Sequence, residues 1–180
     1  MSKVIAAEYL TLDGVMENPA WTTPYFNDEL GEFQSELMTS TDALLLGRVT
    51  YEGFAAAWPA MPDVPGADRM NSLPKYVASR TLTATEWNAE IIAGDVAAAV
   101  RKLKQEPGQN LLIYGSGQLV EYLRRHDLVD TYRLMVFPVV LGSGKRLFTS
   151  AISSSFTLVS SHTTRTGVLV LSYERAGNAS

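Results

Sequence analysis

The sequence predicts an α/β fold in which a central, mostly parallel and twisted sheet is flanked by helices and ends in an antiparallel hairpin. Short apolar runs alternate with helix-like patterns through the first three quarters of the 180 residues, which is typical of β-α-β units around a parallel sheet. From Asp130 onward, strand patterns follow one another without a helix between them. With 46% hydrophobic residues, we expect a single domain over residues 1–180, with an ordered core at about residues 3–174.

Composition narrows the classes of function. Fifteen Lys and Arg stand against 19 Asp and Glu without a long basic run, so we expect no nucleic-acid partner. The chain has no Cys and only His126 and His162, which argues against a disulfide framework and a metal site. No apolar segment approaches the roughly 18 residues needed to span a bilayer, and residues 4–7 lack the pattern of a secretory signal. We therefore expect a cytoplasmic protein without a membrane partner.

The elements of the first third follow from apolar spacing. Residues 4–7 predict the first strand. The next element is a helix with apolar residues at i, i+4, i+7 and i+11, namely Phe26, Leu30, Phe33 and Leu37. Residues 43–46 predict a second buried strand that ends at Gly47. Thr50 is then expected to cap a helix over residues 51–57, which Trp58 and Pro59 end.

The later elements are separated by loops rich in Pro and Gly. Residues 59–74 hold four prolines and predict a long loop with one helical turn near Arg69. This loop has three possible roles: a lid around Met61, a solvated loop, or part of a dimer contact. Further strands are predicted at residues 75–79, 90–93 and 111–114, and helices through residues 96–103 and 119–123. A long strand at residues 134–141, interrupted by Pro138, precedes a hairpin of residues 156–163 and 168–173.

The clearest functional signal is the junction Gly115-Ser116-Gly117, where a strand turns directly into a helix. Glycines let a ligand approach the backbone, and the free N–H groups and dipole of a helix N-terminus attract a pyrophosphate. The third glycine of a Rossmann fingerprint is absent, and the motif lies far from the N-terminus, so a standard dinucleotide fold is disfavoured. The alternative is a turn that uses glycine for steric reasons alone.

Two further strand ends carry an arginine. Arg48 follows Gly47 at the start of a helix, and Arg80 lies between Ser79 and Thr81; a guanidinium group offers several donors to a phosphate. Either arginine alone would more often be a solvated surface residue. Because ligands of open α/β sheets bind outside the carboxyl ends of the strands, the three junctions together predict one extended ligand with several phosphates.

These motifs resemble, in order, those of the dihydrofolate reductase superfamily. The matching segments are residues 11–15, 46–51, 78–82 and 114–117. The C-terminal third is similar to the reductase domain of the bifunctional riboflavin-biosynthesis deaminase-reductase and its stand-alone relatives, through residues 130–133, 137–144 and 147–148. The resemblance covers about residues 3–174. No deaminase portion is expected, because the chain lacks both its cysteines and its length.

The resemblance implies NADPH as the cofactor, lying across the C-terminal edge of the sheet. It implies that residues following two of the strands bind the 2′-phosphate of NADPH and a neighbouring phosphate. These residues are Gly47, Arg48, Thr50, Ser79 and Arg80. It implies a pyrophosphate site at Gly115, Ser116, Gly117, Gln118 and Leu119. It also implies that the nicotinamide is bordered by Ala7, Leu12, Gly14 and Val15. Homodimers are common among such relatives, so the resemblance implies a homodimer as well.

Few catalytic residues are expected, because the cofactor carries the hydride chemistry. Dihydrofolate reductases bind the pterin ring with a carboxylate on the first helix, and Asp28 and Glu29 offer no unambiguous match to it. Glu29 is nevertheless one catalytic candidate, although acids also stabilise the first turn of a helix. Asp13 is the other, although it could equally shape the turn before Gly14.

The candidate substrate residues are Trp21, Phe26 and Arg133. The two aromatic rings could hold a flat heterocycle or simply pack, and Arg133 could bind a ribosyl phosphate if its side chain faces the cleft. The leading hypothesis is an NADPH-dependent reductase of a small heterocyclic, carbonyl or imine substrate, resembling 5-amino-6-(5-phosphoribosylamino)uracil reductase. The alternatives are reduction of dihydrofolate and a non-catalytic NADPH-binding module.

Overall fold

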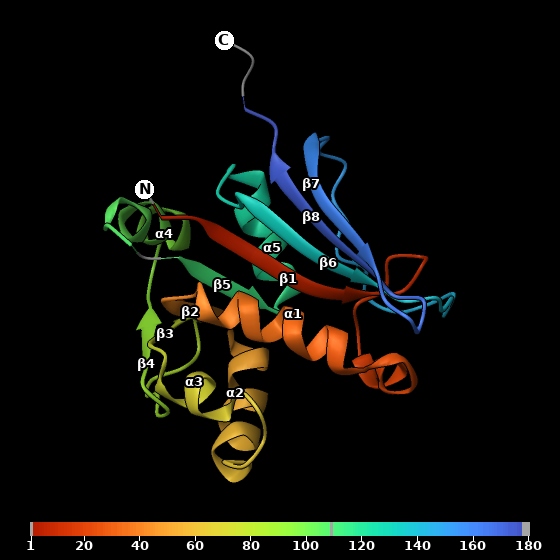
Figure 1. Cartoon of the computed structure of the whole chain (residues 1–180). Helices are drawn as coiled ribbons and strands as arrows, with labels where there is room; N and C mark the ends of the chain where they lie inside the picture. The colour runs from red at the N-terminus through yellow and green to blue at the C-terminus, as the bar shows by residue number, and fades with distance from the viewer. Residues whose placement is uncertain (1, 109, 178–180) are drawn as a thin grey trace.

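Eight strands form one continuous sheet in the order β4-β3-β2-β5-β1-β6-β8-β7 (Figure 1). The structure is a computed structural model and describes residues 2–108 and 110–177; Met1, Gln109 and residues 178–180 of the expected domain lie outside it. The strands are β1 Val4–Leu10, β2 Ala43–Gly47, β3 Lys75–Ala78, β4 Ala89–Ile92, β5 Leu111–Tyr114, β6 Thr131–Val136, β7 Phe156–Thr163 and β8 Leu169–Arg175. The strands β1 to β6 pair in parallel, whereas β8 is antiparallel to both β6 and β7. The predicted α/β fold with a C-terminal antiparallel hairpin is confirmed.

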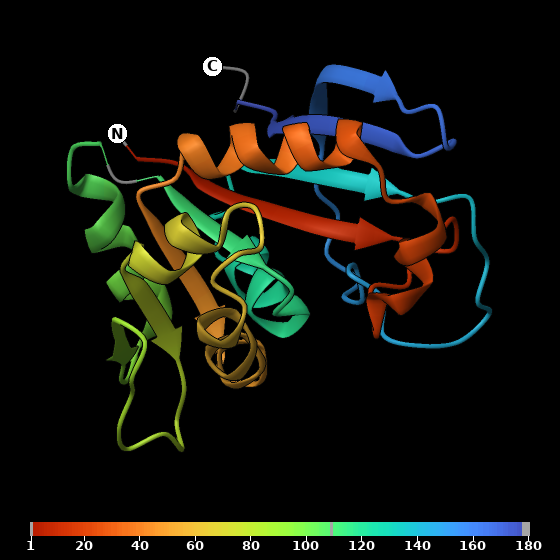
Figure 2. The same ribbon diagram turned by 60° about the horizontal axis from the view of Figure 1, so that its bottom comes forward.

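Helices cover both faces of the sheet (Figure 2). They are α1 Asp28–Thr39, α2 Arg48–Ala57, α3 Ala67–Ser72, α4 Val96–Gln105 and α5 Gly117–Arg125, with short 3₁₀ helices η1 Pro19–Tyr25 and η2 Trp58–Ala60. Residues of α1, α2 and α3 share one core cluster, and residues of α4 and α5 share another. Because side chains alternate along a strand, Ile5 and Ala7 of β1 belong to the first cluster, and Val4 and Ala6 to the second.

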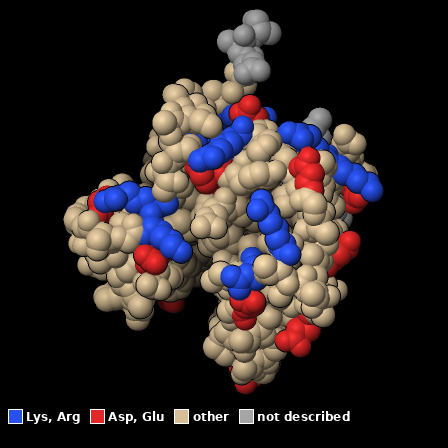
Figure 3. All heavy atoms as spheres, turned by 180° about the vertical axis from the view of Figure 1, so that it is seen from behind, with Lys and Arg blue, Asp and Glu red and all other residues tan. Residues whose placement is uncertain are grey.

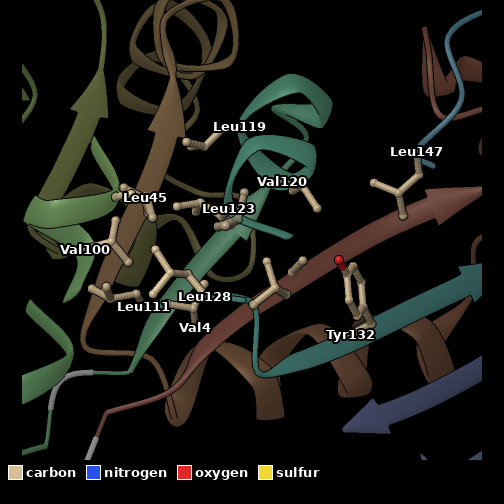
Figure 4. Packing of buried hydrophobic residues seen from close by; sticks show 14 of the residues in the cluster. Val4, Leu45, Val100, Leu111, Leu119, Val120, Leu123, Leu128, Tyr132 and Leu147 are labelled. Carbon is tan, nitrogen blue, oxygen red and sulfur yellow. The ribbon is translucent and has the colours of Figure 1, made fainter. Parts of the chain in front are cut away.

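The central strands are buried on both faces, which is why they read as continuous apolar runs. On the α4–α5 side, Val100 and Leu123 of the helices meet Val4 and Leu45 of the sheet (Figure 4). Tyr132 of β6 points its hydroxyl into this apolar layer. No helix in the described ranges has the length and apolar character needed to cross a bilayer.

Two predicted helix starts are wrong. Phe26 does not belong to the buried face of α1, because Asn27 caps that helix by accepting a hydrogen bond from the Leu30 N–H (3.2 Å). Phe26 precedes the cap and is 45% exposed. The helix α2 begins at Arg48, and its N-cap is Gly47. Thr50 therefore lies within the first turn of α2 and does not cap it.

Two predicted strands differ from the structure by several residues, and the other strands differ by at most two residues at either end. The strand β1 runs on to Leu10, beyond the predicted residues 4–7. The strand β6 runs from Thr131 to Val136 instead of over the predicted residues 134–141. It ends before Pro138, because proline has no N–H to donate to a neighbouring strand. The predicted helical turn near Arg69 is confirmed as α3, which buries Met70 within the loop between α2 and β3.

Candidate functional site

The three strand-end junctions lie side by side at one edge of the sheet. In the sheet, β2 lies between β3 and β5, and all three run parallel. Gly47 at the end of β2 pairs with Ala78 at the end of β3. The turns that carry Arg48, Arg80 and Gly115 therefore emerge next to one another.

Hydrogen bonds join the turn after β5 to the start of α2. The Ser116 hydroxyl accepts a hydrogen bond from the Gly47 N–H at 2.9 Å. The Ser116 N–H donates to the Thr50 hydroxyl at 3.1 Å. Thr50, which was expected as a helix cap, thus fixes the neighbouring turn.

Two glycines in this turn have close neighbours, and the positive φ of Gly115 makes glycine the suitable residue there, whereas at Gly117 the flexible Met16 side chain could move aside. A Cβ on Gly115, which has φ +55°, would lie 3.0 Å from the Thr50 hydroxyl oxygen. A Cβ on Gly117 would lie 2.7 Å from the Met16 sulfur. The first N–H groups of a helix have no partner within the helix, and Ser116 gives α5 no side-chain cap. The backbone of Gly117, Gln118 and Leu119 can therefore hold an anionic group, so the turn fits a pyrophosphate.

Donors for a further phosphate lie at the ends of β2 and β3. Arg48 is about half exposed and pairs with Glu52 one helical turn away (2.9 Å). The Ser79 hydroxyl accepts from the N–H groups of Thr81 and Leu82, which leaves its hydrogen free to donate. Arg80 is exposed. This group fits a phosphate monoester such as the 2′-phosphate of NADPH.

The loop after β1 is fixed by contacts with the segment after β6. The Leu12 N–H donates to the Val139 carbonyl oxygen (2.8 Å), and Val15 pairs with Arg146 in an isolated bridge. Val15 is fully buried, whereas the Leu12 side chain is exposed. Gly14 has φ +80°, which a turn at this point requires. On β1 itself, Ala7 pairs with Tyr114 of β5.

Asp13 connects the same two segments. Its carboxylate accepts hydrogen bonds from the Thr11 hydroxyl (2.6 Å) and from the N–H groups of Gly142 (2.8 Å) and Leu141 (3.3 Å). The Thr11 hydrogen bond and then that of Gly142 lower the pKa of Asp13 to about 2. An ionised, fully engaged carboxylate favours the loop-shaping role of Asp13, and its catalytic role stays a prediction.

Glu29 contacts the β7–β8 hairpin. It accepts hydrogen bonds from the Arg165 N–H (3.0 Å) and side chain (3.3 Å), and it lies 3.0 Å from Nε2 of His162. The Arg165 backbone bond and then His162 lower the pKa of Glu29 to about 2. A hollow of about 210 Å³ beside these groups is lined by Asn27, Asp28, Glu29 and Arg165. This geometry favours anchoring of the hairpin, and a role of Glu29 toward a substrate stays a prediction.

The three candidate substrate residues lie in different surroundings. Trp21 packs edge-on against Phe137, with ring centroids 5.5 Å apart. Phe26 stands edge-on to Tyr9 at 6.5 Å and is partly exposed. The Arg133 guanidinium lies 5.9 Å from the centre of the Phe33 ring of α1, and its Nε is buried without a hydrogen-bond partner among the described residues.

A polar network beside Ala7 was not predicted from the sequence. The side-chain amide of Gln34 donates to the Tyr9 hydroxyl and accepts from the Tyr114 hydroxyl, both at 2.7 Å. Burial raises the pKa of both tyrosines, so the network is neutral at ordinary pH. Its sequence signal is the presence of Tyr9 near the end of β1 and of Tyr114 at the end of the aliphatic strand β5.

Glu8 was missed as well. Its side chain is buried on the α4–α5 side of β1, opposite the Tyr9 network, and is 4% exposed. Burial raises the pKa of Glu8 well above its usual value, although a backbone hydrogen bond from Gly115 opposes that change. A carboxylate within a strand that is otherwise apolar is a signal that the sequence does contain.

The surface of this region is hollowed. Figure 3 shows a depression between the part of the molecule that holds α2 and the part that holds the loops after β1 and β6. Basic and acidic side chains are interspersed on this face and form no continuous basic stripe. Among the residues that the structure describes, no group of three His, Cys, Asp or Glu is placed to hold a metal ion.

Comparison with known proteins identifies relatives over the whole chain. The family model described as RibD C-terminal domain matches residues 2–170. The protein YyaP of Bacillus subtilis (strain 168), which is uncharacterized, is 28% identical over 181 residues, covering 97% of this chain and 96% of YyaP.

Two solved structures have a similar fold. A putative riboflavin biosynthesis protein from Shewanella sp. PV-4 superposes with a TM-score of 0.74 at 23% identity, covering 97% of this chain and 99% of that one. The Thermotoga maritima diaminohydroxyphosphoribosylaminopyrimidine deaminase/5-amino-6-(5-phosphoribosylamino)uracil reductase gives 0.68 at 15% identity, covering 97% of this chain and 57% of that one. At these identities the likeness concerns the fold alone.

Proposed function

The chain belongs to the RibD C-terminal domain family, and we propose on this basis that it is an NADPH-dependent reductase acting in the cytoplasm. The observation that carries the proposal is the hydrogen-bonded contact between Ser116 and Gly47 (2.9 Å). This contact joins two turns that can each hold phosphate groups. One extended dinucleotide would engage both.

Each part of the cofactor has residues that suit it. The N-terminus of α5 at Gly117 and Gln118 would bind the pyrophosphate. Arg48, Arg80 and Ser79 would bind the 2′-phosphate, which favours NADPH over NADH. The bound nicotinamide supplies the hydride, and the protein's task is to orient it against the substrate and to exclude water.

The proposed substrate is a small heterocyclic, carbonyl or imine compound. The Thermotoga maritima relative acts on 5-amino-6-(5-phosphoribosylamino)uracil by its name, which makes such aminouracils the first compounds to test. The neutral network of Tyr9, Gln34 and Tyr114 beside Ala7 suits a substrate with uncharged hydrogen-bonding groups. Reduction of dihydrofolate is less well supported, because Glu29 is occupied by His162 and Arg165.

The test begins with the cofactor and needs no known substrate. Fluorescence titration is expected to show NADPH binding at least about tenfold tighter than NADH, which corresponds to about 1.4 kcal/mol. The protein is then assayed with a panel of aminouracil phosphates, pterins and small carbonyl and imine compounds. Oxidation of NADPH is measured by the loss of its absorbance. Tight binding without oxidation on any compound would favour the non-catalytic module, and no binding of either nucleotide would refute the proposal.

We also propose that the protein forms a homodimer through the outer strand of its hairpin. The strand β7 lies at an edge of the sheet, and Leu158 and Val159 on it are 50% and 57% exposed. Exposed apolar edges are sites of association. Val159→Asp is expected to turn a dimer into a monomer in size-exclusion chromatography with light scattering; a monomeric wild-type chain would refute this part.

A further inference from the structure

Arg133 lies in the same row of the sheet as Ala7, the residue expected to border the nicotinamide. Ala7 pairs with Arg133 of β6 on one side and with Tyr114 of β5 on the other. Paired residues of neighbouring strands point to the same face of a sheet, and the contact of the Arg133 guanidinium with Phe33 shows that this is the face covered by α1 (Figure 2). Arg133 and the polar network that includes Tyr114 therefore flank the small side chain of Ala7.

The guanidinium group of Arg133 has no counter-charge. Among the described residues it makes no hydrogen bond and no ion pair, and its one contact is with the Phe33 ring at 5.9 Å. Its Nε is buried without a partner, whereas the two terminal nitrogens are accessible to solvent. A charge that is partly withdrawn from water without an acceptor is costly. An anionic ligand would supply the missing acceptors.

The strands and the helix around Arg133 supply a single positive charge. The elements α1, β1 and β5 contain no Lys or Arg. The strand β8, on the other side of β6, contains only Arg175, which contacts the Asp127 carbonyl oxygen and pairs with Asp130 at 3.7 Å. In the turn of the hairpin, Arg165 is engaged by Glu29 at 3.3 Å.

One free guanidinium group suits an anion of one charge. A carboxylate matches it in charge and in shape, because the two can form a pair of parallel hydrogen bonds. A phosphate monoester carries between one and two negative charges at neutral pH. It is better matched by the two arginines at the ends of β2 and β3, Arg48 and Arg80.

We infer that Arg133 binds a carboxylate of the substrate, so that the proposed reductase acts on a small ring compound with one acidic substituent. The inference rests on the proposed NADPH function, which places the nicotinamide beside Ala7. The uncharged edge of the substrate would meet the network of Tyr114, and its carboxylate would meet Arg133. This arrangement gives the substrate one orientation against the cofactor.

The test compares carboxylates with carboxamides of the same shape. The compounds are uracil-6-carboxylate, uracil-5-carboxylate and benzoate, each with its amide, and ribose 5-phosphate tests a phosphate in their place. Affinities are measured by calorimetry with saturating NADP⁺, which occupies the proposed phosphate sites and transfers no hydride. The measured quantity is therefore binding, and no turnover is needed.

Two variants and one control separate the charge from the shape of the side chain. Arg133→Met removes the charge but keeps a long side chain that can contact Phe33. Arg133→Lys keeps the charge but cannot form two parallel hydrogen bonds. Arg101→Met, at an exposed position of α4, controls for the change in net charge. Arg133→Met is expected to melt no lower than the wild type, because the Nε that it removes has no partner.

The wild type is expected to bind at least one of the three carboxylates about tenfold more tightly than its amide, the size of a charge-assisted hydrogen bond. Arg133→Met should lose this preference, Arg133→Lys should keep part of it, and Arg101→Met should keep all of it. Affinities for the amides and for NADP⁺ should not change. If Arg133→Met does not fold, the weakened preference of Arg133→Lys decides.

Three results would overturn the inference and leave the proposed function standing. They are a wild type that binds no carboxylate more tightly than its amide, a preference that persists without Arg133, and tighter binding of ribose 5-phosphate than of every carboxylate. In each case the wild type would still bind NADP⁺. Absence of binding of both NADPH and NADP⁺ by the wild type would refute the proposed function and this inference with it.

Discussion

The Ser116 hydroxyl accepts a hydrogen bond from the backbone N–H of Gly47, 69 residues earlier in the chain, at 2.9 Å. This single contact joins the end of β2 to the start of α5. It also orients the two turns at which we propose the phosphates of the cofactor bind. The predictions begin with this contact.

Ser116→Ala is expected to lower the free energy of unfolding by about 1 kcal/mol and to weaken NADPH binding, because the partly buried Gly47 N–H loses its acceptor. Chemical denaturation and fluorescence titration measure the two effects. The control is Ser72→Ala, whose exposed hydroxyl donates to the Arg69 carbonyl oxygen far from the site. Full NADPH affinity in Ser116→Ala would show that the contact does not shape the binding turn.

Arg48→Ala is expected to weaken NADPH binding about 10- to 100-fold, the range for a lost charge-assisted hydrogen bond, and to leave NADH binding nearly unchanged. The reason is that only NADPH carries the 2′-phosphate. Titration of both nucleotides measures the difference, and Arg101→Ala on the exposed side of α4 serves as the control. Equal losses for the two nucleotides would contradict the role of Arg48.

Glu52→Gln is expected to strengthen NADPH binding about twofold, because an exposed ion pair contributes only about 0.2–1 kcal/mol and Glu52 competes for Arg48 (2.9 Å). The gain should vanish in the Arg48→Ala background, which makes the pair a double-mutant cycle. Glu36→Gln, an exposed acid on α1, controls for the change in net charge. A gain that persists without Arg48 would indicate a general charge effect.

Glu29→Gln is expected to destabilise the protein at neutral pH by loosening the hairpin held through Arg165 and His162. The pKa of Glu29 is lowered in the folded protein from 4.5 to about 2, so its stabilisation is present above pH 4.5 and is lost as the pH falls toward 2. The difference in melting temperature between variant and wild type should therefore shrink in acid. Asp28→Asn, its exposed neighbour, should show no such pattern. If the wild type reduces dihydrofolate and Glu29→Gln abolishes that activity, the result would instead support a catalytic role for Glu29.

Glu8→Gln is expected to stabilise the protein increasingly as the pH rises. The pKa of Glu8 is raised above 4.5 in the folded protein by burial, so the folded state holds a proton that the unfolded state releases. Wild-type stability therefore falls as the pH rises from 4.5 through the raised value, and the variant lacks this loss. Melting temperatures between pH 5 and 8 measure the effect; a constant difference would show that Glu8 does not titrate in this range.

The shared edge of the three junctions follows from rules that act on sequence patterns. Parallel strands joined by helices must present their carboxyl ends at one edge, so the Gly47 and Gly115 turns could be predicted to meet. The hydrogen bonds between these two turns could not be predicted, because the spacing of residue types along the sequence does not encode which oxygen faces which N–H. Thr50 illustrates this: its position suits a cap, but α2 begins two residues earlier, and its hydroxyl turns to Ser116.

The side-chain networks were beyond the reach of sequence patterns for a related reason. The sequence places Gln34 on a helix and Tyr9 and Tyr114 on strands, but only the packing of α1 across β1 and β5 brings all three within hydrogen-bonding distance. The partners of Glu29 are likewise 133 and 136 residues away in the chain. Periodicity reports which face of an element is buried, and it carries no information on pairings at such separations.

The order of the last strands has a consequence for synthesis on the ribosome. The strand β7 is made before β8, yet β8 lies between it and β6. Until Arg175 has left the exit tunnel, nascent β7 has no neighbour to pair with, and the outer edge of β6 stays open to other chains. The chain is therefore exposed to aggregation through this edge until its C-terminal strand has been released and has folded against β6.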